Sequence, residues 1–482
     1  MGENELMLLL IVFVPTVGAF ALPLLGRMSV RLRNFSALCL VLISLVLTIV
    51  ISPSAFRGKT ITAGVSFNNA YDFVLRADGL AVFMAIVSTL ISAIIVFYSF
   101  GYISHYENQN EYYLMVVLFL GGMMGLVFSD NLIYLYLFWE ITAITSWRLI
   151  GFFREEQHVL RADKAFLVTI FGSLLMLIGF ISIYQQNGSF NLTAIKENLN
   201  GTHLSNLAVA MILAGILSKS ATLPLHTWLP DAGVAPSPVT ALLHAALLVK
   251  IGVYVFARLF LATFTVDEFW HTAVPIIAAV SALVSAGAAM VDTDLKRIIA
   301  YSTISQIGFI FLGLATGNEI GVAGALLYIL MHGLAKGGLF LCAGIVEQNT
   351  KIKDITRLGG LIKTMPITAV SFLLCAFSVM GIPPFGGFFS KYMVITSSVQ
   401  TGQVWISMVF LVGAFLTIIY LFRAFNMVFL GDLKTPSEKE GSIGMVISVA
   451  ALAALSLAGG IFIYCPSQLV LSAVQQLTGV MR

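Results

Sequence analysis

The stretch ILAGILSKSATLPLHTWLP, residues 212–230, joins an apolar run to one lysine and two prolines. Pro224 cannot donate a backbone hydrogen bond, so the carbonyl of Ser220 loses its helical partner. A lysine near the centre of a membrane helix costs roughly 2.5–3.5 kcal/mol. Lipid does not tolerate free backbone groups, whereas a water-filled cavity inside a protein does. The stretch therefore predicts a membrane helix that breaks beside an internal ion path, and a similar pattern surrounds Lys391.

The composition of the whole chain agrees with this interpretation. Its 482 residues are 59% hydrophobic and 10% charged, with a mean hydropathy of +0.96. These values are typical of a polytopic helical membrane protein. The four cysteines are scattered without a CxxC, and neither a Walker A motif nor a dinucleotide fingerprint occurs. We expect an all-α membrane protein with no metal site and no cofactor, which does not itself use ATP.

About 14 spans of roughly 20 residues are expected. Their approximate bounds are 5–25, 34–52, 78–100, 112–128, 131–152, 163–184, 207–229, 236–262, 271–290, 297–316, 320–346, 366–399, 403–430 and 442–465. The longest segments on the outer side, about 53–77 and 185–206, are each expected to hold a hairpin or a short helix.

The loops predict the orientation. About fifteen Lys and Arg residues fall on the side that is inner when the N-terminus is outside, against about six on the other side. Both termini are therefore expected on the outer face of an energy-transducing membrane, most simply the prokaryotic inner or plasma membrane. The acidic start, with Glu3 and Glu5, argues against a cleaved signal peptide.

A few ionisable residues fall inside the expected spans. The basic ones are Arg148, Lys219, Lys250, Lys336 and Lys391, and Glu140 joins them. At about 3 kcal/mol each, the five cations cost on the order of 15 kcal/mol if unpaired, comparable to a whole folding free energy. They must therefore be paired, hydrated or neutral. Burial disfavours the charged form of a lysine and a nearby carboxylate restores it, so a moving partner moves a proton.

Histidines suit the same relay because they titrate near neutrality. His332 and Lys336 are four residues apart and share a helix face, while His244 lies six residues before Lys250. The glycines around His332 and Lys336 predict a loosened helix or a π-bulge there. Ser302, Ser305 and Gln306 are expected to hold water.

Each candidate has a structural alternative. Glu140 serves as a counter-ion of Arg148, although eight residues place the two about 80° apart on a helix. Lys219 snorkels to an interface, His244 bonds a backbone carbonyl, and Lys391 ends a re-entrant loop. For His226 and Asp231, past the first break, anchoring of the loop is favoured over gating of the path.

The two breaks, in the seventh and twelfth spans, predict an internal repeat. Five spans per unit make the two repeats inverted. The chain then divides into three N-terminal helices (1–110), a first repeat (111–262), a second repeat (263–430) and a C-terminal helix (431–482).

Four motifs carry a family resemblance: LSKSATLPLHTWLPDAGVAPSPVTALLHAALLVKIGVYVFAR (217–258), DLKRIIAYSTISQIG (294–308), MHGLAKGGLFLCAG (331–344) and GIPPFGGFFSK (381–391). They resemble the antiporter-like subunits of respiratory complex I, Mrp-type sodium/proton antiporters, energy-converting hydrogenases and formate hydrogenlyases. The likeness spans roughly residues 70–430. It implies fourteen helices, inverted five-helix repeats and a hydrophilic axis.

By motif position, the resemblance implies that Glu140 and Lys219 form the first pair of the axis. Lys250 is then the bridging lysine, His332 and Lys336 the connecting group, and Lys391 the terminal lysine. Arg148 replaces a residue that is usually uncharged in this family, and a second partner for Glu140 is its expected role.

Three functions remain open. The first is a non-redox, proton-translocating subunit of a redox-driven pump of the complex I or hydrogenase type. The second is a subunit of an Mrp-type Na⁺/H⁺ antiporter, ranked lower because Na⁺ prefers oxygen ligands. The third is a structural scaffold. The chain is expected to lack the long lateral helix of the largest complex I member and the C-terminal extension of the large Mrp subunit. Further antiporter-like subunits, lipid and protons are its expected partners, and nucleic acid is not.

Overall fold

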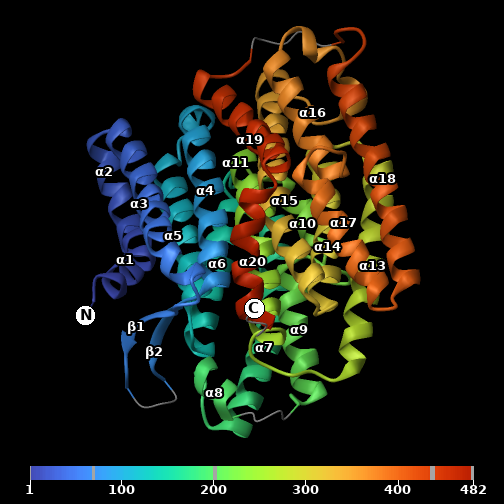
Figure 1. Cartoon of the computed structure of the whole chain (residues 1–482). Helices are drawn as coiled ribbons and strands as arrows, with labels where there is room; N and C mark the ends of the chain where they lie inside the picture. The colour runs from blue at the N-terminus through green and yellow to red at the C-terminus, as the bar shows by residue number, and fades with distance from the viewer. Residues whose placement is uncertain (1, 68–70, 199–202, 435–439, 479–482) are drawn as a thin grey trace.

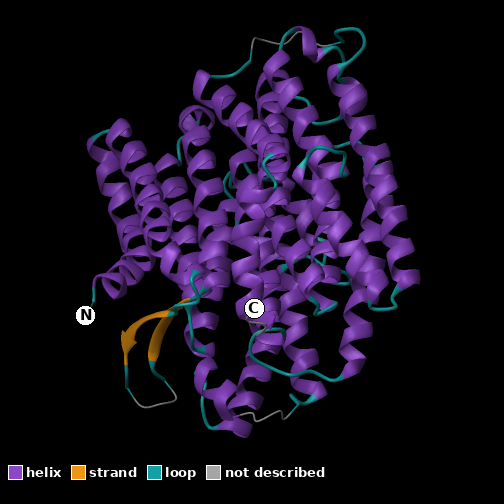
Figure 2. Ribbon diagram, viewed as in Figure 1, coloured by secondary structure: helices purple, strands orange, loops and turns teal. Residues whose placement is uncertain are grey.

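The computed structural model describes residues 2–67, 71–198, 203–434 and 440–478, and these are almost entirely helical (Figure 2). Eleven helices in this part of the chain are long and apolar enough to cross a membrane. The all-α polytopic membrane fold expected from the composition is thereby confirmed. The division into four units and the inverted relation of the repeats remain predictions. Lys439 and Arg482, which contributed to the loop bias, lie outside the described residues.

The N-terminal part places α1, α2, α3 and one hairpin at the edge of the bundle, and its last helix, α4, lies further inside (Figure 1). Its elements are α1 (Glu3–Gly18), α2 (Leu22–Met28), α3 (Val30–Phe56), β1 (Ile61–Val65), β2 (Phe73–Ala77) and α4 (Gly79–Tyr102). The strands are antiparallel, with Ile61 opposite Ala77. This is the hairpin expected in the first outer segment.

The middle part contains the first broken helix. Its elements are α5 (Gln109–Phe128), α6 (Leu132–Ile150), α7 (Glu156–Asn187), α8 (Leu192–Asn198), α9 (Asn206–Lys219), α10 (Trp228–Asp231), α11 (Ser237–Ala241), a π-helical turn (Leu242–Ala246) and α12 (Leu248–Phe260). The short helix expected in the second outer segment is α8.

The last part contains the second broken helix, formed by α16 and α17. Its elements are α13 (Glu268–Val291), α14 (Leu295–Ala315), α15 (Glu319–Thr350), α16 (Pro366–Met380), α17 (Gly386–Gln400), α18 (Val404–Phe429), α19 (Ile443–Ile461) and α20 (Tyr464–Thr478).

The two breaks have the same backbone hydrogen bonds. After α9, the N–H groups of Ala221, Thr222 and Leu225 donate to the carbonyls of Ser218, Leu217 and Thr222. After α16, the N–H groups of Gly381, Ile382 and Phe385 donate at the same offsets, to Ser378, Phe377 and Ile382. Ala221 and Gly381 both have a positive φ, each three residues before a proline. The chain therefore leaves the first half-helix through the same hydrogen-bonded turn at both sites.

The C-terminal end differs from the single span expected over 442–465. Helix α19 starts beside the end of α4, since a Cβ on Gly101 would touch Ser442. It reaches the second break, where a Cβ on Gly460 would lie 2.0 Å from the Pro384 carbonyl. A further helix, α20, then runs to the start of α4, where Gln476 accepts a hydrogen bond from the Gly79 N–H. The chain crosses the bundle here with two helices because α19 ends within it.

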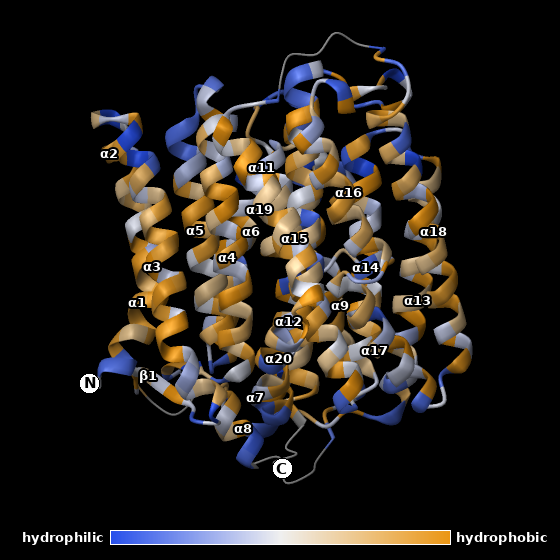
Figure 3. Ribbon diagram, turned by 45° about the horizontal axis from the view of Figure 1, so that its top comes forward, coloured by the Kyte–Doolittle hydropathy of each residue, from blue (hydrophilic) through white to orange (hydrophobic). Residues whose placement is uncertain are grey.

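The core lies around α12, α14 and α15, whose residues are almost all buried, whereas α3 and α18 expose many large apolar side chains. Figure 3 shows the same contrast, with apolar residues on the outer helices and polar ones between the inner helices and at both ends. Helices buried on all sides are the ones that can hold ionisable groups away from lipid.

Candidate functional site

Lys219 lies at the end of α9, where the first helix breaks. Its side chain is completely buried. The Nζ atom donates a hydrogen bond to the Trp139 carbonyl at 3.2 Å and lies 5.1 Å from the centre of the Trp139 ring. Both contacts come from α6, so α6 and α9 together position the ammonium group inside the protein. Snorkelling to an interface is excluded for this residue.

Glu140 follows Trp139 on the same helix and acts electrostatically on Lys219. No salt bridge within 4.0 Å joins these two described residues, and the Oε1 atom of Glu140 is buried without a hydrogen-bond partner. The pair is thus close enough to interact but is not locked by a direct contact. A small movement of either side chain changes how strongly the carboxylate favours the charged lysine.

Lys250 is positioned by a feature that the sequence did not reveal, the π-helical turn Leu242–Ala246. The turn ends at Leu247, whose backbone is not helical, and Lys250 Nζ donates to the carbonyl of Ala245 within it. A π turn inserts one residue into a helical turn and changes which face the next residues occupy. His244 lies in this turn, and its ring contacts Phe340 of α15 at a centroid distance of 4.4 Å.

Helix α15 crosses directly beside Lys250. A Cβ on Gly333 would lie 3.4 Å from Lys250 Nζ, so glycine at this position leaves the space next to the amine open. The helix is continuous from Glu319 to Thr350, which corrects the loosening expected around its glycines. Tight packing explains the difference, since Gly333 and Gly338 accommodate side chains of α4 and α16 rather than bending α15.

Lys336 and Lys391 repeat the contact seen at the first two lysines. Lys336 Nζ donates to the Ile299 carbonyl of α14 at 3.0 Å, and Lys391 Nζ donates to the Val379 carbonyl of α16 at 2.7 Å. Val379 occupies the position in the second break that Lys219 occupies in the first. Lys391 also lies over the Phe309 ring, 4.7 Å from its centre. All four lysines thus bind main-chain carbonyls of breaks or neighbouring helices.

His332 lies among these groups. It is completely buried, and Lys250, Lys336, His244 and Lys391 all act on it electrostatically. Both ring nitrogens of His332 and of His244 lack a hydrogen-bond partner within the protein. Buried polar atoms are nearly always hydrogen-bonded, so water is their expected partner.

Around Lys391 the polar side chains are mostly paired with each other. Tyr328 donates to Gln306 at 2.6 Å, Gln306 to Thr417 at 3.2 Å, and Tyr420 to Ser302 at 2.8 Å. Ser302 and Gln306, where water is expected, thus also have side-chain partners. The hydroxyl of Ser305 is buried without one.

Three further candidates lie away from this axis. Arg148 pairs with Glu111 at the start of α5 rather than with Glu140. Asp231 binds Lys164 at 2.7 Å and Arg297 at 2.9 Å, which supports the anchoring role. His226 is half-buried in the segment between α9 and α10, and its Nδ1 atom has no partner.

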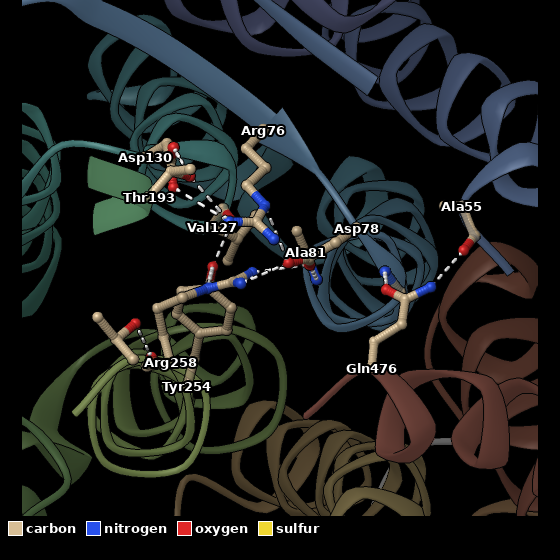
Figure 4. Close-up of polar contacts among 12 residues, drawn as sticks. Ala55, Arg76, Asp78, Ala81, Val127, Asp130, Thr193, Tyr254, Arg258 and Gln476 are labelled. Carbon is tan, nitrogen blue, oxygen red and sulfur yellow. Dashed lines mark hydrogen bonds and ion pairs between the residues drawn. The ribbon is translucent and has the colours of Figure 1, made fainter. Parts of the chain in front are cut away.

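A second buried charged group, which Figure 4 shows, was not predicted from the sequence. Arg258 is 5% exposed and binds Asp78 through two hydrogen bonds of 2.5 and 2.8 Å. Its Nε atom donates to Tyr254 at 3.0 Å. The sequence does contain a pattern that indicates this group. One helix face carries polar residues at intervals of four, namely Lys250, Tyr254 and Arg258.

Metal binding has no support among the described residues, where no three His, Cys, Asp or Glu side chains are grouped closely enough to hold an ion. The arrangement is instead a row of amines and imidazoles between membrane helices. Together with the two matching helix breaks, this row defines an antiporter-like membrane protein.

The sequence assigns the family. The model described as NADH:quinone oxidoreductase/Mrp antiporter, transmembrane, matches residues 129–417, and the chain belongs to this family. The N-terminal model of NADH-ubiquinone oxidoreductase (complex I) chain 5 matches residues 66–113.

Named relatives are similar over much of this chain. One Na⁺/H⁺ antiporter subunit, from Alkalihalophilus pseudofirmus, is 35% identical over 424 residues, which are 81% of this chain and 52% of that protein. Another Na⁺/H⁺ antiporter subunit, from Staphylococcus haemolyticus, is 32% identical over 97% of this chain and 62% of its own length. The chain thus spans between half and two thirds of these relatives.

Two solved structures share the fold. A chain of the Mrp complex from Dietzia has a TM-score of 0.92 with 22% identity, covering 99% of this chain and 98% of its own. A chain of an archaeal membrane-bound sulfane sulfur reductase has a TM-score of 0.90 with 25% identity, covering 98% and 97%.

Proposed function

We propose that this protein moves protons along the row formed by Glu140, Lys219, Lys250, His332, Lys336 and Lys391. The observation that carries the proposal is the carbonyl contact shared by the four buried lysines. A neutral amine and an ammonium ion both donate to a carbonyl oxygen, so this contact survives loss of the proton. A lysine locked to a carboxylate would instead be held in its charged form.

The charge state of each lysine then depends on its neighbours. Burying an unpaired charge costs several kcal/mol, and two positive charges close together repel each other. Two adjacent lysines of the row are therefore both protonated only at high cost. The protonation of Lys219 is coupled electrostatically to the Glu140 carboxylate. At the other end, Lys250, Lys336 and Lys391 act on one another directly or through His332.

Lys219 and Lys250 flank one tight helix contact. A Cβ on Gly252 of α12 would lie 2.1 Å from the hydroxyl of Ser220, the residue that follows Lys219. We place the transfer between the two halves of the row here, because the break after α9 meets α12 at this contact, two residues after Lys250.

The protein is proposed to work in a membrane complex of several subunits, with further antiporter-like subunits among them. The curated relatives are named Na⁺/H⁺ antiporter subunits, and this favours an Mrp-type assembly. A redox-driven pump is the second candidate, supported by the likeness to the sulfane sulfur reductase chain. In both, this chain carries the protons, because its row offers amines rather than the oxygen ligands that Na⁺ prefers.

Lys219 tests the proposal in the assembled complex, reconstituted into vesicles with a fluorescent pH indicator. Lys219→Ala should abolish proton movement, and Lys219→Arg should abolish it too, because a guanidinium keeps its proton. The matched control is Lys363→Ala, which removes an exposed lysine of the loop after α15. Coupled transport at the wild-type rate in Lys219→Arg would show that only a positive charge is needed and would reject the relay.

The driving reaction needs a separate measurement. Purification of the complex with its partners, followed by assay with an Na⁺ gradient and with electron donors, distinguishes the two assemblies. Proton movement driven by Na⁺ alone supports the Mrp type, and movement that requires electron transfer supports the redox type.

A further inference from the structure

A charged cavity of about 460 Å³ opens beside the β1–β2 hairpin, on the face predicted to be outer. It lies where the end of α3, the end of β2, α8, the end of α12 and α20 come together. Its charged lining consists of Arg57, Arg76, Asp78, Asp130, Lys196 and Arg258. Basic groups outnumber acidic ones, so the cavity disfavours Na⁺ and other metal cations.

The two carboxylates of the cavity have different environments (Figure 4). Burial raises the pKa of Asp78, but the charges of Arg258 and Arg76 outweigh it and bring the pKa to about 2. Burial raises the pKa of Asp130, and here the opposing effects of the Thr193 hydrogen bond, Arg76 and Arg258 are too small to cancel it. Asp78 therefore stays ionised, whereas Asp130 is the carboxyl group that can carry a proton.

A polar face of α12 leads from the cavity towards the lysine row. Arg258 contacts Tyr254, whose hydroxyl group donates to the Val127 carbonyl, and Lys250 follows one turn further on. From Arg258 to Lys250 the helix rises about 12 Å. All three side chains are buried in the protein, so this face is not exposed to lipid.

Helix α4 also begins at this cavity, which its residue Leu80 helps to line. It starts at Asp78 and carries Ser88 and Ser92, whose hydroxyl oxygens are buried without a partner. Ser88 shares a helix face with Ser92, four residues on, and with Ile91, three residues on. Ile91 packs against Gly333 beside Lys250. Unpaired hydroxyls at this level are sites where water is expected to bind.

We propose that this cavity is the mouth of a proton path that joins water on the hairpin face to Lys250, with Asp130 as the proton-accepting group at the entrance. Protons pass from Asp130 by way of water between α4 and α12, along Tyr254 and the two serines. Arg258 keeps its own proton and is held by Asp78, so its fixed charge turns metal cations back. The path rests on the proposed function, since it supplies or drains the same lysine row.

Chemical blocking of the mouth tests the path in the assembled complex. Thr60 lines the cavity, whereas its neighbour Lys59 does not. Thr60→Cys and the matched control Lys59→Cys are made in a background where Cys39 and Cys465 are replaced by serine, because the other two cysteines are buried. Each is treated with a membrane-impermeant trimethylammonium methanethiosulfonate, and labelling is followed by mass spectrometry.

The expected result is that labelled Thr60→Cys loses proton transport while labelled Lys59→Cys keeps it. Asp130→Asn should in addition slow transport at least about tenfold without labelling. Normal transport in fully labelled Thr60→Cys, together with its loss in Lys219→Ala, overturns the path and leaves the proposed function intact. Normal transport in labelled Thr60→Cys and also in Lys219→Ala overturns the proposed function as well.

Discussion

At the scale of single residues, the main-chain carbonyl is the recurrent partner of the buried cations. Trp139, Ala245, Ile299 and Val379 each offer a carbonyl oxygen to one lysine. A carbonyl compensates part of the desolvation of an amine without fixing its charge. Arg258 is treated differently, because a carboxylate holds it in two-pronged contact. The four lysines, which can gain or lose a proton, thus have carbonyl partners, whereas Arg258, which stays charged, has a carboxylate partner.

Asp78→Asn tests this fixed pair. The Asp78 carboxylate has a depressed pKa of about 2 in the folded protein, so its stabilising effect is fully present above the unfolded value of about 3.9. That effect is lost as the pH falls through about 2. At pH 7 we expect the variant to lose about 3–5 kcal/mol of stability, because the buried Arg258 loses its carboxylate partner and keeps only the Tyr254 hydroxyl.

Thermal melts of the detergent-solubilised protein, followed by tryptophan fluorescence, measure this effect. The difference in melting temperature between the wild type and Asp78→Asn should become smaller below pH 4. Asp432→Asn, which changes an exposed carboxylate, serves as the control. A variant that melts like the wild type at pH 7 would show that the pair adds nothing to stability.

At the scale of the elements, the two broken helices create the positions of Lys219 and Lys391. Each break frees carbonyls and turns the chain through a residue with positive φ. At the second break the two half-helices approach each other very closely, since a Cβ on Gly387 would lie 1.8 Å from the Ser378 carbonyl oxygen. Only glycine lets the start of α17 pass the end of α16 at this distance.

Gly387→Ala should therefore destabilise the protein by about 1–3 kcal/mol, the usual cost of overpacking. Gly413→Ala in α18 is the matched control, because a Cβ there meets no atom within 4 Å. An alanine in that helix should be neutral or stabilise by about 0.5–1 kcal/mol. The amount of folded protein after heating, measured by size-exclusion chromatography, compares the two, and equal recovery would contradict the close approach.

At the scale of the whole molecule, apolar helices surround an interior that contains the charges. The start of α1, the hairpin, α8 and the end of α20 lie at the same end of the bundle (Figure 3). Gln476 fixes the last of these, since it binds both Gly79 and the Ala55 carbonyl. With the loop charges, this arrangement predicts that both chain ends face outward.

Epitope tags on the two termini test that topology in intact cells and inverted vesicles. When protease is added to intact cells whose outer membrane or cell wall has been removed, both tags should be digested. In inverted vesicles neither tag should be digested. The cysteine of Lys363→Cys, in the loop after α15, should react with a membrane-impermeant thiol reagent only from the opposite side of the membrane, that is, in inverted vesicles. Tags that are cleaved from different sides would contradict the arrangement.

The class of fold, the position of both breaks and the identity of the buried lysines could all be predicted from the order of amino acids alone. This is possible because hydropathy and proline act locally: an apolar run of about 20 residues needs a membrane, and a proline removes a hydrogen bond wherever it occurs. The resemblance to a family, which the match over 129–417 confirms, rests on the same local motifs.

The contacts of those lysines became visible only in the folded molecule. The pairing of Arg148 with Glu111 and the burial of Arg258 against Asp78 depend on helices that are distant in the sequence. Local rules do not specify them, because a side chain in a low-dielectric interior takes the nearest polar partner, and helix packing places that partner.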